Sequence, residues 1–218
     1  MEIRPTIEIN MALTLTYSVS TVRFIAGTLA VLCWLSLLLQ WTLLYGRVNH
    51  SVRHTLARFF GYFTILSNTL VAISFSLWFI YPVDRLSGTL QATLFTAICV
   101  YIIIVAVIYH ALLRKLAVLQ GLDQLVNAML HTWLPVSYIV CWQLLMPAGL
   151  LDFTLIPYFL IFPVLYLVYV LLLGYKTDHY PYPFINVLES GYAAVLRNAV
   201  FITLGFILLS CLLIWWKS

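Results

Sequence analysis

Two polar residues in otherwise apolar stretches, Thr64 and His131, could perform chemistry together. A hydroxyl within hydrogen-bond reach of a neutral imidazole is the smallest arrangement of a nucleophile and a general base. The imidazole accepts the hydroxyl proton while the oxygen attacks a carbonyl carbon, and it then returns that proton to the leaving group. We therefore expect hydrolysis of an ester, a reaction that needs neither a metal ion nor a cofactor.

Small and polar side chains share one helical face with Thr64. Positions spaced by three and four residues lie on one side of a helix, and here they are Gly61, Thr64, Ser67, Asn68 and Val71. Thr64 lies about five residues into its apolar run, which corresponds to a depth of roughly 8 Å. The Asn68 amide could donate to the oxyanion that forms during attack, and we expect Ser67 to support it.

His131 also has polar neighbours at helical spacing. Asn127 lies one turn before it, Gln124 two turns before and Tyr138 two turns after, so the four share one face. Pro135 has no N–H group to donate to the His131 carbonyl, which frees an acceptor beside the imidazole and favours a kink. We expect Asn127 to be a second candidate donor to the oxyanion and Tyr138 to line the pocket.

Asn198 and His110 complete the candidate set. Asn198 begins the last apolar run on the same side and offers a third amide to the oxyanion. His110 lies near the end of its run, where it either joins the pocket or caps its helix. Because no apolar run has a charged residue in its middle, an asparagine, a tyrosine or a backbone carbonyl would have to orient His131.

Each candidate also has a purely structural interpretation. A threonine hydroxyl in a helix commonly bonds to the carbonyl four residues earlier, and a histidine can tie two membrane helices together. Depth favours the catalytic interpretation, because Thr64 and His131 are expected at nearly equal depths on parallel helices that enter from the same side.

The elements that must position these residues are membrane-spanning helices. Of the 218 residues, 64% are hydrophobic and 8% are charged, whereas a soluble domain is close to half apolar and a quarter charged. This composition excludes a soluble enzyme, a nucleic-acid binder and a disordered protein. A helix that crosses the bilayer core needs about 20 apolar residues, and lipid offers the backbone no partners outside a helix or a closed barrel.

We predict an all-α, polytopic membrane protein in which residues 1–218 form one domain. The six predicted transmembrane helices are 24–45, 59–81, 90–113, 124–146, 153–174 and 198–216. The stretch 9–22 is too short to span the bilayer, and we expect it to lie at the membrane interface. Residues 175–195 are expected to form the longest connection, with its tyrosines at headgroup level. No cleavable signal peptide is expected, and the four cysteines lie inside apolar runs rather than in a disulfide framework.

Basic residues predict the orientation. Seven lysines and arginines fall on the side opposite the N-terminus and four on the N-terminal side. Because positive charge accumulates on the cytoplasmic side, we expect Arg47, Arg53 and Lys115 to be cytoplasmic, with Thr64 and His131 near that side. Arg23 abuts the first span and argues for the opposite orientation.

Two motifs resemble the androgen-induced six-span membrane proteins and their bacterial relatives: Phe63-Thr-Ile-Leu-Ser-Asn68 and Asn127-Ala-Met-Leu-His-Thr-Trp-Leu-Pro135. Tyr182-Pro-Phe184 resembles a late motif of that family. The resemblance implies a threonine hydrolase of fatty acid esters of hydroxy fatty acids, with Thr64 as the nucleophile and His131 as the essential histidine.

The resemblance also bears on the source of the chain. The position of Ser67 is acidic or an amide in the eukaryotic members, and the pair Ser67 and Asn68 looks more like the bacterial ones. It therefore implies a multi-pass protein of a bacterial cell (inner) membrane that takes a lipid substrate from the bilayer and contacts membrane lipids, with no nucleic-acid partner. The oligomeric state stays open.

Three other classes were weighed against a hydrolase. A lipid-binding protein or transporter would suit Pro157 and Pro163, which interrupt the fifth span. A haem protein could use only His110 and His131 as axial ligands within the spans. A catalytic zinc usually needs three protein ligands, and the spans supply two histidines.

Overall fold

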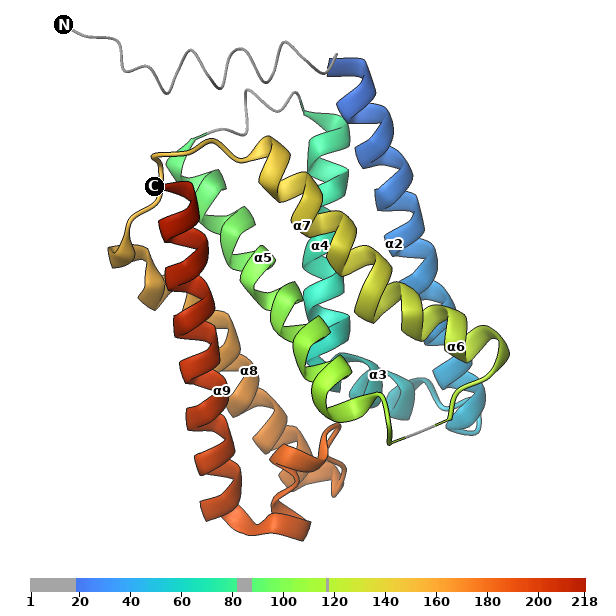
Figure 1. Ribbon diagram of the computed structural model, residues 1–218. Coiled ribbons are helices and arrows are strands. Elements are labelled where there is room, and N and C mark those ends of the chain that lie inside the picture. The colour runs from blue at the N-terminus through green and yellow to red at the C-terminus, as the bar shows by residue number, and fades with distance from the viewer. Residues whose placement is uncertain (1–18, 82–87, 117) are drawn as a thin grey trace, which may run out of the picture.

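Residues 19–81, 88–116 and 118–218 are described by the computed structural model, which is shown in Figure 1. Helices make up 86% of it, and the described part contains no strand. Six of its helices are long and apolar enough to cross a membrane. The predicted all-α, multi-pass architecture is therefore confirmed.

The chain follows one helical element after another. The α-helices are α2 (Val19–Arg47), α3 (Val52–Gly61), α4 (Phe63–Ile80), α5 (Thr89–Ile108), α6 (Gly121–Ala128), α7 (Leu134–Leu145), α8 (Ile156–Thr177) and α9 (Val187–Lys217). Two π-helical segments, η2 (Tyr109–Leu113) and η3 (Met129–Trp133), extend α5 and join α6 to α7. Short 3₁₀ turns, η4 (Phe153–Leu155) and η5 (Pro183–Ile185), precede α8 and α9.

The second predicted span, 59–81, is wrong at its start. A separate amphipathic helix, α3, ends at Gly61, Tyr62 is extended, and α4 begins at Phe63. The Tyr166 hydroxyl donates to the Gly61 carbonyl at 2.8 Å, which satisfies an acceptor left free where α3 ends. Thr64 is thus the second residue of its helix rather than about the fifth residue of a longer one.

The first and last spans are longer than predicted. α2 begins at Val19, so the last part of the expected interfacial stretch is helical, and residues 9–18 lie outside the described residues. α9 begins at Val187 and kinks at Gly191, where a positive φ of 73° suits a residue without a side chain. The expected connection 175–195 therefore shrinks to residues 178–186.

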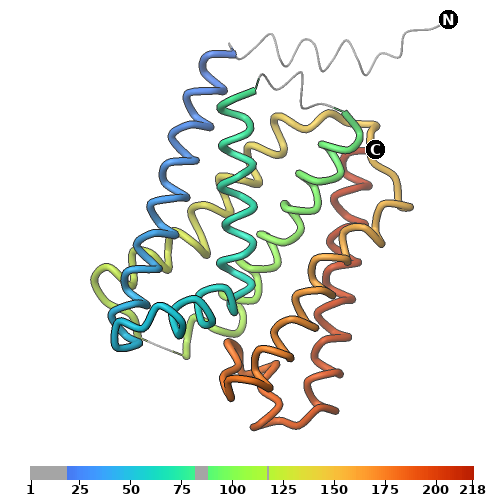
Figure 2. The backbone as a smooth tube through the Cα atoms, turned by 180° about the vertical axis from the view of Figure 1, so that it is seen from behind, coloured from blue at the N-terminus to red at the C-terminus, as the bar shows by residue number. Residues whose placement is uncertain are grey.

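The helices form two groups around α5. α2 packs along α4, and the line of α6, η3 and α7 crosses them obliquely rather than in parallel (Figure 1). α8 and α9 form a pair on the other side of α5, as the view from behind also shows (Figure 2). The start of α2 and the end of α9 lie at one end of the bundle, as an even number of crossings requires (Figure 2).

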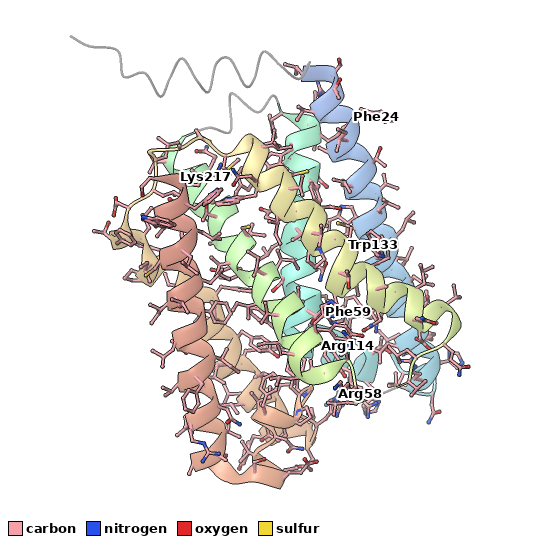
Figure 3. The ribbon with its side chains drawn as sticks, viewed as in Figure 1. Phe24, Arg58, Phe59, Arg114, Trp133 and Lys217 are labelled. Carbon is pink, nitrogen blue, oxygen red and sulfur yellow. The ribbon has the colours of Figure 1, made fainter. Side chains whose placement is uncertain are left out.

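Arg58 and Arg114 lie at the end opposite Lys217 (Figure 3), and we call their end the basic end. Arg23 at the start of α2 donates to the Phe79 carbonyl at 2.8 Å, where α4 ends. This bond gives Arg23 a structural role in joining two helices. Arg58 and Arg114 lie opposite Lys217, as the sequence predicts, while Arg4 and Arg85 lie outside the described residues.

Candidate functional site

The structure brings the side chains of Thr64 and His131 together. The Thr64 Oγ1 atom lies 3.4 Å from the His131 Nε2 atom, within the range of a hydrogen bond. Thr64 comes from the first turn of α4 and is 7% exposed, and half-buried His131 comes from the π-helical segment η3. Catalytic hydrogen bonds are often long before substrate binds, so this spacing suits a nucleophile and its base.

The second ring nitrogen fixes which tautomer His131 adopts. Its Nδ1 atom lies 3.0 Å from the Asn127 backbone oxygen. A carbonyl can only accept, so Nδ1 carries the proton and Nε2 presents a lone pair to Thr64. The Tyr109 ring stacks on the imidazole with centroids 4.1 Å apart, and the Asn127 amide donates to the Tyr109 hydroxyl.

A missing backbone donor explains how the His131 segment is held. The Leu134 N–H bonds to the Met129 carbonyl, five residues earlier, so the helix is in π register. The next bond in that register would join Pro135 to the Leu130 carbonyl, but proline has no N–H group. The Asn68 side chain takes its place, since its Nδ2 donates to the Leu130 oxygen at 3.1 Å.

Asn68 therefore ties the two halves of the site together. The same Nδ2 atom donates to the Thr64 backbone oxygen at 2.9 Å, one helical turn earlier on α4. One buried amide thus bonds to the backbone on both sides of the pair. This placement positions Thr64 against η3 and corrects the expectation that Asn68 donates to an oxyanion.

Tyr182 is the third side chain at the Thr64 hydroxyl. Its hydroxyl lies 3.3 Å from Thr64 Oγ1 and accepts from the Thr64 N–H at 3.3 Å. That N–H is available because it belongs to the first turn of α4, which has no side-chain cap. The break after Gly61 therefore creates a helix N-terminus directly beside the nucleophile.

Tyr182, Thr64, His131 and the Asn127 carbonyl form a chain of hydrogen bonds in which each group donates to the next. Because Nε2 of His131 can only accept, the Thr64 hydroxyl donates to it, and the Tyr182 hydroxyl then donates to Thr64 Oγ1. His131 Nδ1 donates to the Asn127 carbonyl. The threonine proton is thus already directed at its acceptor.

Packing holds Tyr182 in place. Its ring stacks on Phe184 at 5.1 Å and meets Tyr62 edge-on at 5.7 Å, and the residue is 8% exposed. The Asn198 amide donates to the Phe184 carbonyl at 2.9 Å, which fastens this turn to α9. Burial raises the pKa of Tyr182 to about 12, although its hydrogen bonds with Thr64 oppose the rise. The phenol therefore keeps its proton at neutral pH.

Tyr182, which belongs to the connection expected at headgroup level, is buried at the site. The sequence does not indicate its role there, although it belongs to the Tyr182-Pro-Phe184 motif. Tyr109, which stacks on His131, was not singled out either. Because the chain contains 14 tyrosines, residue type alone does not indicate which of them lie at the site.

The remaining candidates lie away from the Thr64 hydroxyl. Asn127 and Asn198 direct their amides to Tyr109 and Phe184, so they support the site rather than donate to an oxyanion. Ser67 is fully buried, and its hydroxyl has no hydrogen-bond partner among the described residues. The expected direct contribution of the two asparagines to the oxyanion is corrected accordingly, whereas the supporting role expected of Ser67 stays a prediction.

His110 and Tyr138 take structural positions. Exposed His110 lies with its Nε2 3.0 Å from the Thr132 hydroxyl, so it joins η2 to η3. Tyr138 is fully buried, and its hydroxyl donates to the Phe95 carbonyl at 3.2 Å and lies 3.3 Å from the Ser74 hydroxyl oxygen. The expectation that Tyr138 lines the pocket is wrong, because the π register and the oblique course of η3 and α7 change which residues face it.

Two cavities meet at Thr64 and Tyr182. The first, which we call the apolar groove, has a volume of about 90 Å³ and lies between α5, α8 and α9. It is lined mainly by Phe63, Ile104, Val105, Ile108, Val164, Leu167, Ile202 and Phe206. Val164 is 50% exposed, so the groove reaches the lipid-facing surface.

The second cavity, which we call the polar chamber, has a volume of about 320 Å³. Its polar lining includes Arg47, Tyr109, Arg114, Asp123, Asn127 and His131. A chain that lies in the groove and continues into the chamber must pass the Thr64 hydroxyl. The candidate nucleophile and its base therefore lie between an apolar groove and a polar chamber.

Within the described residues, no three histidine, cysteine or acidic side chains are grouped so that they could hold a metal ion. Comparison of the chain with family models, with curated proteins and with solved structures finds no match. What the chain does must therefore be argued from its own geometry.

Proposed function

We propose that the chain is an intramembrane hydrolase of lipid esters in which Thr64 is the nucleophile and His131 the general base. One observation carries the proposal: the Thr64 hydroxyl faces the unprotonated nitrogen of an imidazole whose other nitrogen is held by a backbone carbonyl. A histidine that only tied helices together would not need to present a lone pair to a hydroxyl between two cavities.

In the first half-reaction, Thr64 Oγ1 attacks the ester carbonyl carbon while its proton moves to His131 Nε2. A tetrahedral intermediate forms, and its negative charge lies on the former carbonyl oxygen. When the bond between this carbon and the alcohol oxygen breaks, the Nε2 proton moves to that oxygen. The free alcohol leaves, and the acyl group stays on Thr64 as an ester.

In the second half-reaction, water replaces the alcohol. His131 Nε2 takes a proton from the water as its oxygen attacks the acyl carbon, and then gives the proton to Thr64 Oγ1 as the fatty acid leaves. The Asn127 carbonyl accepts from Nδ1 throughout, so it stabilises the imidazolium that exists between the two proton transfers. Neither half-reaction requires a metal ion or a cofactor.

Two donors beside Thr64 would stabilise the oxyanion. The Tyr182 hydroxyl donates to Thr64 Oγ1 before attack, and a short reorientation would aim it at the new oxyanion. The Thr64 N–H lies at the N-terminus of α4, where the positive end of the helix dipole favours a negative charge. These groups take the part that the sequence assigned to asparagine side chains.

The two compartments suit an ester that carries a long acyl chain. The apolar groove accepts the chain from the bilayer between α8 and α9, and the polar chamber accepts the remainder. Fatty acid esters of hydroxy fatty acids, which the resemblance to the androgen-induced six-span proteins implies, have this shape. A bacterial inner membrane is what the resemblance implies, and the charge distribution favours a cytoplasmic position for the basic end.

Hydrolysis by matched variants tests the proposal. The Thr64→Ala variant should lose ester hydrolysis by at least about a hundredfold, while the purified protein keeps the melting temperature of the native chain within a few degrees. Thr69→Ala is the matched control, because Thr69 lies on the same helix and its hydroxyl donates to the Ile65 carbonyl of that helix. Full activity in Thr64→Ala would contradict the proposal.

Lipid binding without turnover is the second candidate function. It is favoured by the apolar groove, which could hold an acyl chain with no chemistry at Thr64. A protein of this kind would bind an acyl ester with the same affinity in its native form and as Thr64→Ala, and neither form would release fatty acid.

A further inference from the structure

The polar chamber contains more positive than negative charge. Arg47 from the end of α2 and Arg114 from the end of η2 line it, together with one carboxylate, Asp123 of α6. The chamber also contains the Thr64–His131 pair. The excess cation therefore lines the same cavity as the proposed reacting groups.

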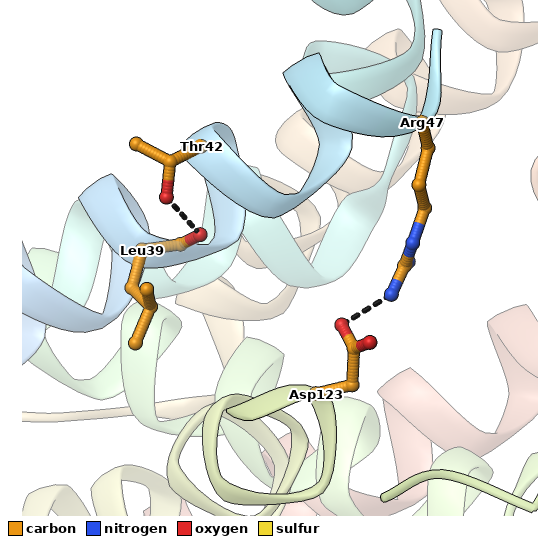
Figure 4. A network of polar contacts seen from close by, with 4 residues as sticks. All are labelled: Leu39, Thr42, Arg47 and Asp123. Carbon is orange, nitrogen blue, oxygen red and sulfur yellow. Dashed lines mark hydrogen bonds and ion pairs between the residues drawn. The ribbon is translucent and has the colours of Figure 1, made fainter. Parts of the chain in front are cut away.

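The two arginines differ in their partners. Arg47 forms an ion pair with Asp123, which joins α2 to α6 at the edge of the chamber (Figure 4). Arg114 lines the same chamber, and no carboxylate of the described chain pairs with it. The pair of Arg47 with Asp123 is neutral as a unit, so Arg114 supplies the excess charge.

We propose that the polar chamber binds an anionic group, a carboxylate or a phosphate, carried by the alcohol half of the ester, and that Arg114 is its ligand. The inference rests on the proposed function, because it assumes an ester bond at Thr64. The guanidinium presents a planar set of N–H donors that matches the oxygens of either group. Arg114 thereby selects among esters that the groove and Thr64 would otherwise treat alike.

The arrangement of the two cavities assigns the anion to the alcohol half. The groove is lined almost wholly by apolar side chains, where an anion without a partner would be costly. The fatty acyl chain therefore occupies the groove, and the part beyond the ester oxygen occupies the chamber at the basic end. After cleavage, the released alcohol carries its charge on the side of the bundle where Arg58 and Arg114 lie (Figure 3).

Two substrate pairs test the inference and distinguish its two sources of anion. The first pair is the palmitoyl ester of a hydroxystearic acid and the methyl ester of the same compound. The second pair is palmitoyl glycerol phosphate and palmitoyl glycerol. For each pair, kcat/KM is measured in lipid nanodiscs with the native chain, Arg114→Gln and Lys115→Gln, which removes a neighbouring charge that does not line the chamber.

For at least one pair, the native chain should prefer the charged member, and Arg114→Gln should reduce that preference about tenfold, as expected for a charge-assisted hydrogen bond. Lys115→Gln should keep the native preference. The pair that responds identifies carboxylate or phosphate as the preferred anion. The same preference in Arg114→Gln and in the native chain, for both pairs, would overturn the inference.

A binding measurement separates this inference from the proposed function. An ether analogue of the palmitoyl ester, as the free carboxylate and as its methyl ester, is titrated into native and Arg114→Gln protein by calorimetry. A preference for the carboxylate that requires Arg114 would support the anion site even if no ester is hydrolysed, in which case the proposed function alone fails. The ether analogues of palmitoyl glycerol phosphate and palmitoyl glycerol are titrated in the same way. Equal binding of the charged and uncharged member of both analogue pairs by the native chain would overturn the anion site, whatever the hydrolysis assays give.

Discussion

Replacing Tyr182 with phenylalanine removes one hydroxyl from the site and little else. The ring would still stack on Phe184 and meet Tyr62, because both contacts involve the aromatic ring only. What is lost is the donor to Thr64 Oγ1 and the acceptor of the Thr64 N–H, both at 3.3 Å. The variant therefore separates the chemistry of Tyr182 from its packing.

The size of the expected effect follows from the role of that donor. Removal of one oxyanion donor in other hydrolases lowers kcat by about 10²–10³-fold, and we expect Tyr182→Phe to fall in this range. KM should stay within about threefold, because the donor acts on charge that exists only in the transition state. The Thr64 N–H left without its acceptor should cost about 1–3 kcal/mol of stability.

Steady-state hydrolysis of a palmitoyl ester gives kcat and KM, and thermal unfolding in detergent gives the change in stability. Tyr180→Phe is a matched control, because this tyrosine belongs to the same turn and does not line either cavity. If Tyr182→Phe keeps more than a third of native kcat, Tyr182 does not stabilise the oxyanion, and the assignment of donors beside α4 is refuted.

Three further predictions concern the other parts of the site. His131→Ala should lower kcat by about 10²–10⁴-fold, because the threonine loses its base, as fatty acid release would show. Asn68→Ala should lower stability by about 1–3 kcal/mol, because the Leu130 carbonyl loses its donor; denaturation in detergent measures this. Since the folded pKa of Tyr182 is raised to about 12, its contribution to stability is fully present below about pH 10, the unfolded value, and is lost as the pH rises towards 12. Unfolding temperatures over that range, compared with those of Tyr182→Phe, measure the loss.

Controls and contrary outcomes differ among these three. If His131→Ala keeps the native kcat, His131 is not the general base. His179→Ala is the control, because this histidine lines neither cavity. An Asn68→Ala protein as stable as the native chain would show that another group satisfies Leu130. Identical alkaline profiles for native and Tyr182→Phe protein would argue against the raised pKa.

The sequence predicts the bundle well because hydropathy is a property of long runs. Each of the six predicted spans overlaps one long apolar helix, and Arg58 and Arg114 lie at the end opposite Lys217 as expected. The boundaries shift where a local hydrogen bond decides the outcome. At the break at Tyr62, the Tyr166 hydroxyl donates to the Gly61 carbonyl, a contact over 105 residues that no local pattern encodes.

The pair of Thr64 and His131 could be predicted, and their 3.4 Å contact places the two side chains at nearly the same level of the bundle. The local structure differs from the expectation, because Thr64 lies in the first turn of α4 and His131 in a π-helical segment that crosses α4 obliquely. Pro135 did indicate a disturbed backbone at the right place. The π register could not be derived, because it depends on which side chain compensates for the missing N–H group.

The support of the site was harder to predict than its centre. A buried asparagine can donate to an oxyanion or to a nearby carbonyl, and only the packing around it decides. The amide of Asn68 bonds to two carbonyls, and those of Asn127 and Asn198 bond to Tyr109 and to the Phe184 backbone. Residue type alone therefore identified polar groups near the site but not their partners.

The most direct test is to trap the acyl group on the protein. The native chain is treated with a lipophilic β-lactone, which acylates an activated hydroxyl, and the modified residue is located by peptide mass spectrometry. The account predicts one adduct on Thr64, absent in Thr64→Ala and strongly slowed in His131→Ala. An adduct on another residue, or one of equal rate without His131, would contradict the claim that these two side chains form a nucleophile and its base.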